Sequence, residues 1–389
     1  MRIAIAHESV DTDGGVETYL LSSIAELRKR GHQIALVYYR RSPAPSVLRS
    51  SANTAVGIEE RGFDSAFDYL RSWKPDVCYS HNMSPLAVER AMLDGWPVVK
   101  MLHGFFGTCI SGLKMQAWPT PRACARTCGP ACLALYVPKR CGQLSVRRMI
   151  DGYRWAGQQR RLFDRYSSIV VASRYMRDEF ARHGAPEDRI NVVPLFSTMT
   201  ATGTIASGEP DTVLFAGRMT SLKGGDVLIR AIERAGGILG RRITLLMAGD
   251  GPQKAEWRTL ASSIGVQVEM TGWVAFADRA RVYGRGRVLA VPSLWPEPFG
   301  LVGLDAASMG LPAVAFDVGG VREWLQDGAT GRLVDPRSGA EGLAEAIAHL
   351  LDRPAELEQM GRAALATSRR MTVASHVETL ERVLQDSAA

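Results

Sequence analysis

Residues 292–306 read Pro-Ser-Leu-Trp-Pro-Glu-Pro-Phe-Gly-Leu-Val-Gly-Leu-Asp-Ala and follow the short apolar run Val288–Val291. The run predicts a buried strand, the prolines predict a loop around Glu297, and the stretch from Phe299 onward predicts a helix. The first amides of a helix have no partner within it, so they are available to whatever the loop faces. Glu297 can accept hydrogen bonds from sugar hydroxyls. Asp305, eight residues further on, falls in the second turn of this helix; it either reaches a ribose diol or pairs locally on the helix surface.

The same strand-then-helix order surrounds this stretch on both sides. The predicted strands are Thr212–Ala216, Ile243–Ala248, Gln267–Thr271, Val288–Val291 and Ala313–Phe316. The helices between them begin near Gly225, Pro252, Asp278, Phe299 and Val321, and three more follow at Ala340–Leu351, Pro354–Ser368 and Val373–Gln385. Such alternation is typical of a parallel sheet with helices on both faces.

The first half of the chain has this order as well. Its predicted strands are Arg2–His7, Gln33–Tyr39, Asp76–His81, Val98–His103, Ser168–Ala172 and Ile190–Val193. Its predicted helices are Gly15–Arg30, Phe63–Trp73, Pro85–Leu93, Leu144–Tyr166 and Arg174–His183. The order breaks at Gly104–Arg140, and the small polar residues 198–210 predict a linker. We therefore expect two α/β domains with a ligand in the cleft at the carboxyl ends of the strands.

Two further groups of residues suggest a phosphate site. Gly14-Gly15 lies between the first strand and its helix, where it forms either a tight turn or a close backbone approach to an anion. Arg218 and Lys223 follow the strand Thr212–Ala216 and are five residues apart. They are either two solvated surface cations or a pair that neutralises a diphosphate. The chain has no G-x-G-x-x-G motif, which argues against a Rossmann dinucleotide enzyme.

Composition and charge narrow the class of protein. The 389 residues are 46% hydrophobic and 22% charged, which excludes collagen-like and largely disordered chains. The net charge of +7 comes from one region, since residues 100–165 hold twelve Lys and Arg against two acids. This suggests an anionic partner. The apolar start Met1–Ala6 is broken by His7 and Glu8, so we expect no signal peptide and a cytoplasmic protein.

The second half of the chain resembles the retaining glycosyltransferases of family 4. The matching residues are Gly217-Arg218, Lys223-Gly224, Gly249-Asp250-Gly251-Pro252, Glu297-Pro-Phe-Gly300, Gly319-Gly320, Glu323 and Gly328-Ala-Thr-Gly331. The first half is similar through Gly14-Gly15-Val-Glu17, Pro75-Asp76 leading to His81, and His103-Gly104. The resemblance implies a GT-B fold: two facing Rossmann-like domains with a cleft between them and a C-terminal crossover helix.

The resemblance also implies domain boundaries and roles for individual residues. An acceptor-side domain would span residues 1–197, with an insert at about 105–142 and the C-terminal helix at about 372–389; the nucleotide-sugar domain would span 211–371. The implied donor-binding residues are Gly15, Arg218, Lys223, Glu297, Phe299, Gly300, Leu301 and Asp305, and the implied catalytic residues are His103, Arg218, Lys223 and Glu297. His103 would lie beside the reacting sugar; otherwise it is a core histidine at a strand end. No cofactor is required for the transfer.

Two positions depart from the family pattern. The family has Glu, seven residues and Glu, whereas the second acid here is the shorter Asp305. The strand that begins at Ile190 normally ends in Pro-Asn-Gly, whereas Pro194-Leu-Phe stands here.

Five of the six cysteines fall within 33 residues, and the last four read C-x3-C-x3-C-x8-C. Cys124, Cys128, Cys132 and Cys141 are therefore candidate ligands of a structural zinc ion. Free thiols, disulfides and an iron–sulfur cluster are the alternatives, and disulfides are disfavoured in the cytosol.

The partners follow from these observations. The leading hypothesis is transfer from a nucleotide-sugar donor to a glycan or lipid-linked saccharide acceptor in bacterial surface polysaccharide synthesis. The basic segment around Arg147–Arg165 is either a solvated helix or a surface for anionic lipid on the inner face of the cell membrane. An inactive GT-B protein that binds nucleotide sugars is an alternative. A nucleic-acid binder is another, but the chain shows no recognised nucleic-acid module, so we expect no such partner.

Overall fold

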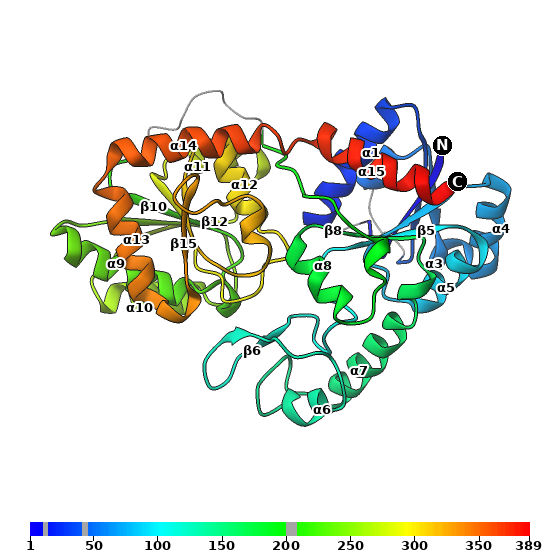
Figure 1. Ribbon diagram of the computed structural model, residues 1–389, viewed down its shortest axis with the longest axis horizontal. Coiled ribbons are helices and arrows are strands. Elements are labelled where there is room, and N and C mark those ends of the chain that lie inside the picture. Colours follow the sequence, from blue (N-terminus) through cyan, green and yellow to red (C-terminus); the bar gives the residue numbers. More distant parts are fainter. Residues whose placement is uncertain (11–14, 41–45, 200–207) are drawn as a thin grey trace. The chain divides into compact units, whose positions relative to one another are not determined.

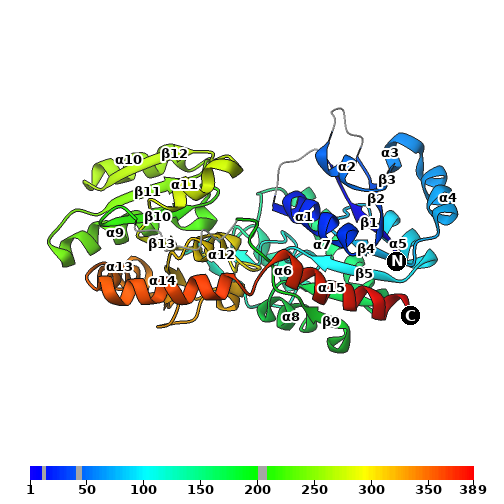
Figure 2. The same ribbon diagram turned by 90° about the horizontal axis from the view of Figure 1, so that it is seen from above.

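The structure, a computed structural model, describes residues 1–10, 15–40, 46–199 and 208–389. It divides the chain into two compact units (Figures 1 and 2). The first unit holds residues 1–114, 125–194 and 373–389, and the second holds residues 115–124 and 195–372. Gly14 and residues 200–207 of the predicted linker lie outside the described residues.

The first unit contains a parallel sheet in the order β3-β2-β1-β4-β5-β8-β9. These strands are β1 (Arg2–His7), β2 (Gln33–Tyr38), β3 (Thr54–Gly57), β4 (Val77–Ser80), β5 (Val98–Leu102), β8 (Ser168–Val171) and β9 (Ile190–Val192). The interior strand β1 is buried from Ile3 to Ala6 and pairs with β2 and β4 on its two sides. A strand covered on both faces needs a continuous apolar run, which is why the first residues of the chain are apolar. The sequence did not predict β3, which is only four residues long.

Helices link these strands. They are α1 (Gly15–Lys29), α2 (Val47–Ser51), α3 (Ile58–Arg61), α4 (Phe63–Trp73), α5 (Leu86–Gly95), α6 (Ala131–Tyr136), α7 (Val146–Arg160) and α8 (Arg174–Ala181). The single helix predicted over 144–166 ends earlier, since a 3-10 turn at Phe163–Arg165 follows α7. The segment between β5 and α6, which has no clear periodicity, contains a short antiparallel hairpin of β6 (Met115–Gln116) and β7 (Arg122–Ala123).

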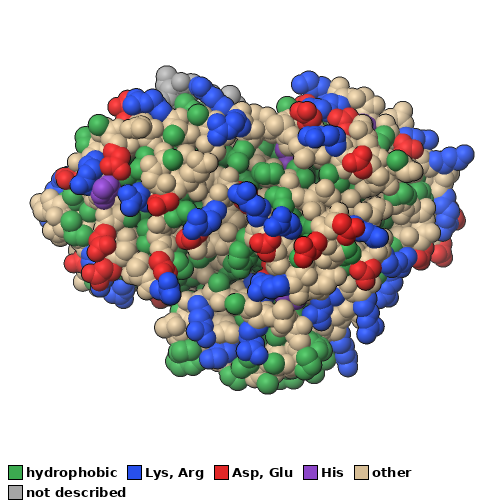
Figure 3. Space-filling model, viewed as in Figure 1, with side chains coloured by type: hydrophobic (Ala, Val, Ile, Leu, Met, Phe, Trp, Pro, Cys, Tyr) green, Lys and Arg blue, Asp and Glu red, His purple; other side chains and the backbone are tan. Residues whose placement is uncertain are grey.

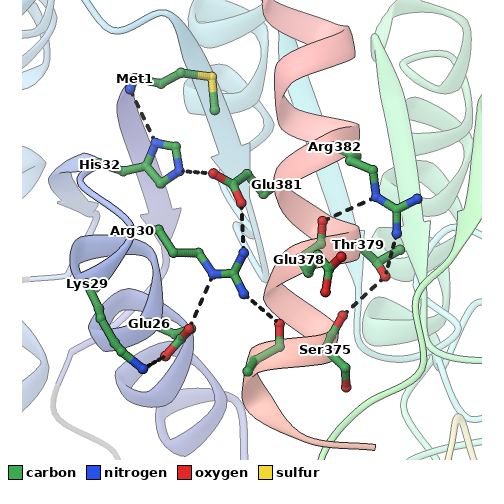
Figure 4. A network of polar contacts seen from close by, with 11 residues as sticks. Met1, Glu26, Lys29, Arg30, His32, Ser375, Glu378, Thr379, Glu381 and Arg382 are labelled. Atoms are coloured by element: carbon green, nitrogen blue, oxygen red, sulfur yellow. Dashed lines mark hydrogen bonds and ion pairs between the residues drawn. The ribbon is translucent and has the colours of Figure 1, made fainter. Parts of the chain in front are cut away.

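The last helix, α15 (Val373–Ala388), belongs to the first unit although it follows the second along the chain. Glu381 of α15 accepts hydrogen bonds from Arg30 at 3.1 Å and from His32 at 2.7 Å (Figure 4). Arg30 also donates to the backbone carbonyl of Ala374 at 3.0 Å. Burial of Val377, Leu380 and Leu384 on the same helix completes the docking. These residues are three and four positions apart, so they form one apolar side of α15, and this side packs against the first unit.

The second unit is built around a parallel sheet in the order β12-β11-β10-β13-β14-β15. Its strands are β10 (Thr212–Ala216), β11 (Thr244–Ala248), β12 (Gln267–Gly272), β13 (Val288–Val291), β14 (Ala313–Phe316) and β15 (Gly331–Val334). Its helices are α9 (Gly225–Leu239), α10 (Lys254–Ser263), α11 (Arg279–Tyr283), α12 (Leu301–Ser308), α13 (Gly339–Leu351) and α14 (Pro354–Ser368). Helices α9, α10 and α13 pack together, and α12 packs with α14 on the opposite face of the sheet (Figure 1).

Two elements of the second unit differ from the sequence prediction. The helix expected near Val321 is a short 3-10 turn over Gly319–Glu323. The strand β15 was not predicted, since it has only four residues and one of them is the charged Arg332. No helix in the described part of the chain is long and apolar enough to cross a membrane.

Candidate donor site

The loops after β10 and β11 touch backbone to backbone at the carboxyl edge of the second sheet. Gly217 N donates to Ala248 O at 2.9 Å, and Met219 N donates to Asp250 O at 2.8 Å. A β-carbon on Gly249 would overlap the carbonyl of Gly217, and Gly249 has a φ of 141°. The Gly249–Pro252 motif therefore fixes the path of the loop that carries Arg218, rather than presenting a reactive side chain.

Glu297 lies at the centre of this edge, in the loop after β13. Its Oε1 accepts hydrogen bonds from Lys223 Nζ at 2.5 Å and from Ser293 Oγ at 2.5 Å. The Glu297 side chain is only 6% exposed, whereas that of Lys223 is 23% exposed. Lys223 Nζ also stands 5.3 Å from the centre of the Trp295 ring, where the cation faces the π-system. Both bonds from described residues end on Oε1, so Oε2 is the atom of this carboxylate that can accept a ligand hydroxyl.

The next loop holds Glu297 from the other side. Gly320 N donates to the backbone carbonyl of Glu297 at 2.6 Å. A β-carbon on Gly319 would overlap the backbone of Glu297, so only glycine allows this approach. The sequence prediction singled out Glu297 and Lys223 but missed Ser293. The available signal was its position, two residues after the end of β13 and four residues before Glu297.

Arg218 and the start of α12 complete the edge. Arg218 is exposed, and among the described residues its side chain has no hydrogen-bond or ion-pair partner. Helix α12 begins at Leu301 without a side-chain cap, after Gly300 in a left-handed conformation (φ 89°). The carbonyl of Phe299 accepts a bond from Trp324 Nε1 at 2.8 Å. Uncapped N-terminal amides and a free guanidinium both favour an anion at this place.

Packing under α12 leaves no room for a larger residue at Gly303. A β-carbon there would overlap the indole of Trp324, which is itself 2% exposed. The glycine therefore sets how closely the helix start approaches the loop that holds Glu297.

Asp305 is buried on α12, at 8% exposure, and not on the helix surface. Its Oδ1 accepts a hydrogen bond from Ser197 Oγ at 2.6 Å. Burial raises the pKa of this carboxyl group, and the Ser197 hydrogen bond acts in the opposite direction. The hydrogen bond described for Asp305 is therefore not a local pairing on the helix surface, since its partner lies 108 residues earlier in the chain. The predicted ribose contact stays a prediction.

His103 and Gly15, the other predicted site residues, belong to the first unit. Gly15 is the exposed first residue of α1. His103 Nε2 and His81 Nδ1 share a hydrogen bond of 2.9 Å. Burial lowers the pKa of His103 to about 3, and it lowers the pKa of His81 well below 6.5. Both imidazoles are therefore neutral, and one nitrogen of the pair donates while the other accepts.

Behind His81 and His103 lies a buried polar cluster that reaches α15. Tyr19 OH bonds to Tyr79 OH at 2.7 Å and to His376 Nε2 at 2.9 Å. Burial lowers the pKa of His376 to about 4. We call His81, His103 and His376 the histidine cluster. The neutral state of its members means that His103 can offer a hydrogen bond but not a positive charge.

The cysteines group differently from their spacing. Cys124 belongs to the second unit, where its Sγ accepts a bond from Gln116 Nε2 at 3.7 Å. Burial raises the pKa of Cys128 to about 11, and the nearby thiols of Cys132 and Cys109 act in the same direction. Within the described ranges, no three His, Cys, Asp or Glu side chains are placed to hold a metal ion. The four predicted zinc ligands are therefore not brought together, and zinc binding stays a prediction.

A buried ion pair attaches the cysteine-containing insert to α8. Lys114 Nζ lies 2.5 Å from Glu179 Oε1 and donates to the Arg126 carbonyl at 2.6 Å. Cys128 N donates to His183 Nε2 at 2.9 Å. Burial, with the charge of Lys114 as the next cause, lowers the pKa of His183 to about 3. Long-range contacts thus hold a segment that has no periodic pattern of its own.

Comparison with known proteins identifies the family. Residues 13–196 match the family model described as Glycosyltransferase Family 4, and residues 210–353 match Glycosyl transferases group 1. A D-inositol 3-phosphate glycosyltransferase of Corynebacterium diphtheriae is 33% identical over 96% of this chain and 90% of that protein. The chain belongs to glycosyltransferase family 4. The D-inositol 3-phosphate glycosyltransferase of Nocardia farcinica, at 27% identity over 93% of this chain and 82% of its own length, is a further relative.

Solved structures show the fold of this glycosyltransferase. Anabaena HepE in complex with UDP superimposes with a TM-score of 0.70 at 18% identity, over 99% of this chain and 100% of HepE. Sucrose-phosphate synthase from Thermosynechococcus elongatus gives a TM-score of 0.72 at 18% identity, over 99% and 98% of the two chains. The predicted α/β GT-B fold with two Rossmann-like domains is confirmed, and the protein is a transferase enzyme.

Proposed function

We propose that this glycosyltransferase moves a sugar, with retention of anomeric configuration, from a nucleotide-diphosphate sugar to a glycan or lipid-linked saccharide. The observation that carries the proposal is the Lys223–Glu297 pair at 2.5 Å, at the same sheet edge as Arg218, whose side chain has no partner among the described residues. It places two cations and one hydroxyl acceptor at a single sheet edge. Transfer into bacterial surface polysaccharide at the inner face of the cell membrane, with peripheral attachment, is the setting in which a lipid-linked acceptor would be met.

In the proposed reaction the bond between the anomeric carbon and the diphosphate oxygen breaks, the oxygen of an acceptor hydroxyl bonds to that carbon from the same face, and the hydroxyl proton leaves on the diphosphate. Negative charge then grows on the leaving diphosphate. Arg218, Lys223 and the uncapped amides at the start of α12 stabilise this charge, and they do so best in the transition state, where it is largest. In the proposal Arg218 and Lys223 provide the neutralisation that the step needs, so it includes no metal cofactor.

The sugar would be held by neutral and acidic groups. Glu297 Oε2 accepts a hydroxyl hydrogen bond while Oε1 stays on Lys223 and Ser293. In this proposal His103 adds a neutral imidazole, whose ring nitrogens can donate or accept a hydrogen bond with a sugar hydroxyl. Asp305 would bind the ribose after releasing Ser197.

The relatives support the donor class more than the acceptor. Solved HepE structures contain UDP, UDP with glucose, and UDP-glucose. The relatives differ in the reaction that their names give: one is a D-inositol 3-phosphate glycosyltransferase and another is an alpha-D-kanosaminyltransferase. We therefore rank UDP-sugars first among donors and keep a glycan or lipid-linked saccharide as the proposed acceptor.

A donor screen tests the proposal. Purified enzyme is incubated with a panel of UDP-, GDP-, ADP- and dTDP-sugars, and release of the nucleoside diphosphate is measured. We expect one nucleotide class to be turned over and Arg218→Ala to lose most of that turnover. Arg234→Ala is the matched control, because Arg234 on α9 is an exposed arginine paired with Glu341 at 3.1 Å. Unchanged turnover in Arg218→Ala would contradict the site assignment.

A further inference from the structure

One surface of the first unit combines exposed apolar side chains with arginines. We call it the α6–α7 face and define it by Val137, Leu144, Val146 and Ile150 together with Arg140, Arg147 and Arg154. The four apolar residues are 42, 65, 59 and 38% exposed. They are four of eleven large hydrophobic residues this exposed among those that the structure describes, and they fall within 14 consecutive positions. Single exposed apolar residues are ordinary, but a group of them marks an interaction site.

The orientation of α7 holds this face outward. Val146, Ile150 and Arg154 are four residues apart, so they lie on one side of the helix. The opposite side carries the buried Gln159, whose Nε2 donates to Tyr166 OH at 2.9 Å inside the first unit. The opposite side of α7 therefore packs into the first unit, and the side with Val146 and Ile150 faces outward.

The charge around the face has one sign. Residues 104–161 contain ten Lys and Arg against a single acid, Asp151. Asp151 lies 3.8 Å from Arg147, and the two side chains are 63% and 93% exposed. An exposed pair of this kind is weak and screened by salt, so it does not cancel the field of the other arginines. Figure 3 shows Lys and Arg side chains beside apolar ones over the region of α6 and α7.

We propose that the α6–α7 face docks on a bilayer that contains anionic phospholipid. The apolar side chains would enter the boundary between head groups and acyl chains, and the arginines would contact the lipid phosphates. Positive charge alone would suit any polyanion, but an apolar centre surrounded by cations matches a lipid surface and not a nucleic acid backbone. The proposal deepens the proposed function, on which it rests for its purpose: it names the surface that would bring the enzyme to a lipid-linked acceptor.

Vesicle sedimentation with the full chain tests the face. Sucrose-loaded vesicles of phosphatidylcholine are used with and without phosphatidylglycerol, at low and high salt. We expect the enzyme to pellet with the anionic vesicles and to be released by salt. One arginine near an anionic surface contributes about fivefold to binding, so Arg147→Glu/Arg154→Glu should lose about 25-fold or more. Val146→Asp/Ile150→Asp should lose about tenfold or more, because it removes the inserted apolar area.

Matched controls come from the second unit. Ile238→Asp changes an apolar residue on α9 that is 59% exposed, as exposed as Val146. Arg234→Glu changes an exposed arginine on the same helix. Both should bind vesicles as the wild type does. Thermal unfolding of all variants shows whether any loss comes from misfolding.

The outcomes separate this inference from the proposed function. Equal recovery in the supernatant with both vesicle types would overturn it, as would wild-type binding by Val146→Asp/Ile150→Asp. Binding of RNA that this apolar variant keeps, with no binding of vesicles, would mean that the face is a polyanion site instead. Vesicle binding without release of nucleoside diphosphate from any donor would leave the docking face standing and refute the proposed reaction. Donor turnover by the variants that change the α6–α7 face should stay at the wild-type level.

Discussion

Replacing Lys223 by Met separates the contact of this residue with Glu297 from the role that we propose for it, neutralisation of the donor diphosphate. The Met side chain keeps most of the length of Lys but removes the charge. The Glu297 side chain is 6% exposed, and after the change its carboxylate keeps only the Ser293 hydrogen bond among those described. A buried charge without its partner is costly. Because Lys223 is itself 23% exposed, water can reach the carboxylate, and we expect a loss of about 1–3 kcal/mol in the free energy of unfolding.

The same substitution should lower turnover much more than it lowers stability. Removing one group that stabilises developing charge costs about 10²–10³ in kcat, or about 2.7–4 kcal/mol. We therefore expect nucleoside diphosphate release to fall by about 100-fold or more in Lys223→Met. Urea unfolding and initial-rate kinetics on the same preparations give the two quantities.

The double variant Lys223→Met/Glu297→Gln makes the reasoning refutable. A neutral amide does not need a cation, so the free energy of unfolding should return toward the wild-type value. Activity should stay low, because the charge that faces the diphosphate is still missing. A single variant that turns over within about threefold of the wild type would show that Lys223 does not face the leaving group. A double variant as active as the wild type would refute the electrostatic argument as a whole.

Three further predictions concern stability and the cysteines. The histidine cluster is neutral when folded but protonates near pH 6.5 when unfolded, so the unfolded chain binds more protons at lower pH. The free energy of unfolding should fall as pH drops from about 6.5 toward about 4, by up to about 1.4 kcal/mol per pH unit for each histidine; His376→Asn should make the urea-measured slope shallower. Gly303→Ala should cost about 1–3 kcal/mol by overlap with the buried indole, whereas Gly237→Ala, with nothing within 4 Å of its new β-carbon, should cost nothing. X-ray fluorescence tests the zinc prediction: zinc bound by the wild type should be lost in Cys128→Ser, which removes one of the four predicted ligands, and metal-free wild-type protein would end the zinc hypothesis.

The repeating order of strands and helices could be predicted well from the sequence. Buried parallel strands are continuous apolar runs, and Ile3–Ala6 and Val288–Val291 show this without any knowledge of their neighbours. Short elements were missed for the same reason, since four residues such as Thr54–Gly57 carry too little pattern. Within the candidate site, the sequence placed Glu297 and Lys223 at strand ends, where chain-local turn signals mark the carboxyl edge of the sheet.

What depended on distant parts of the chain could not be predicted. The helix period gave the position of Asp305 in its second turn but not the Ser197 hydroxyl that it meets, 108 residues earlier. Spacing selected Cys124 as a ligand, whereas folding puts it in the second unit and brings Cys109 to Cys128. His81 and His103 end two different strands and meet only because β4 and β5 are neighbours in the sheet.

The sequence alone thus determined the α/β class, the carboxyl-edge loops and the chemical types of the residues in the candidate site, because these follow from local periodicity and turn chemistry. The tertiary structure decided which groups meet: Lys223 and Ser293 on one oxygen of Glu297, neutral histidines around His103, and α15 returning to Arg30 and His32. These contacts depend on how sheets order their strands and on which helix faces are buried. The strand order and the buried helix faces are set only when the whole chain packs, because each of these contacts joins residues that are far apart in the sequence.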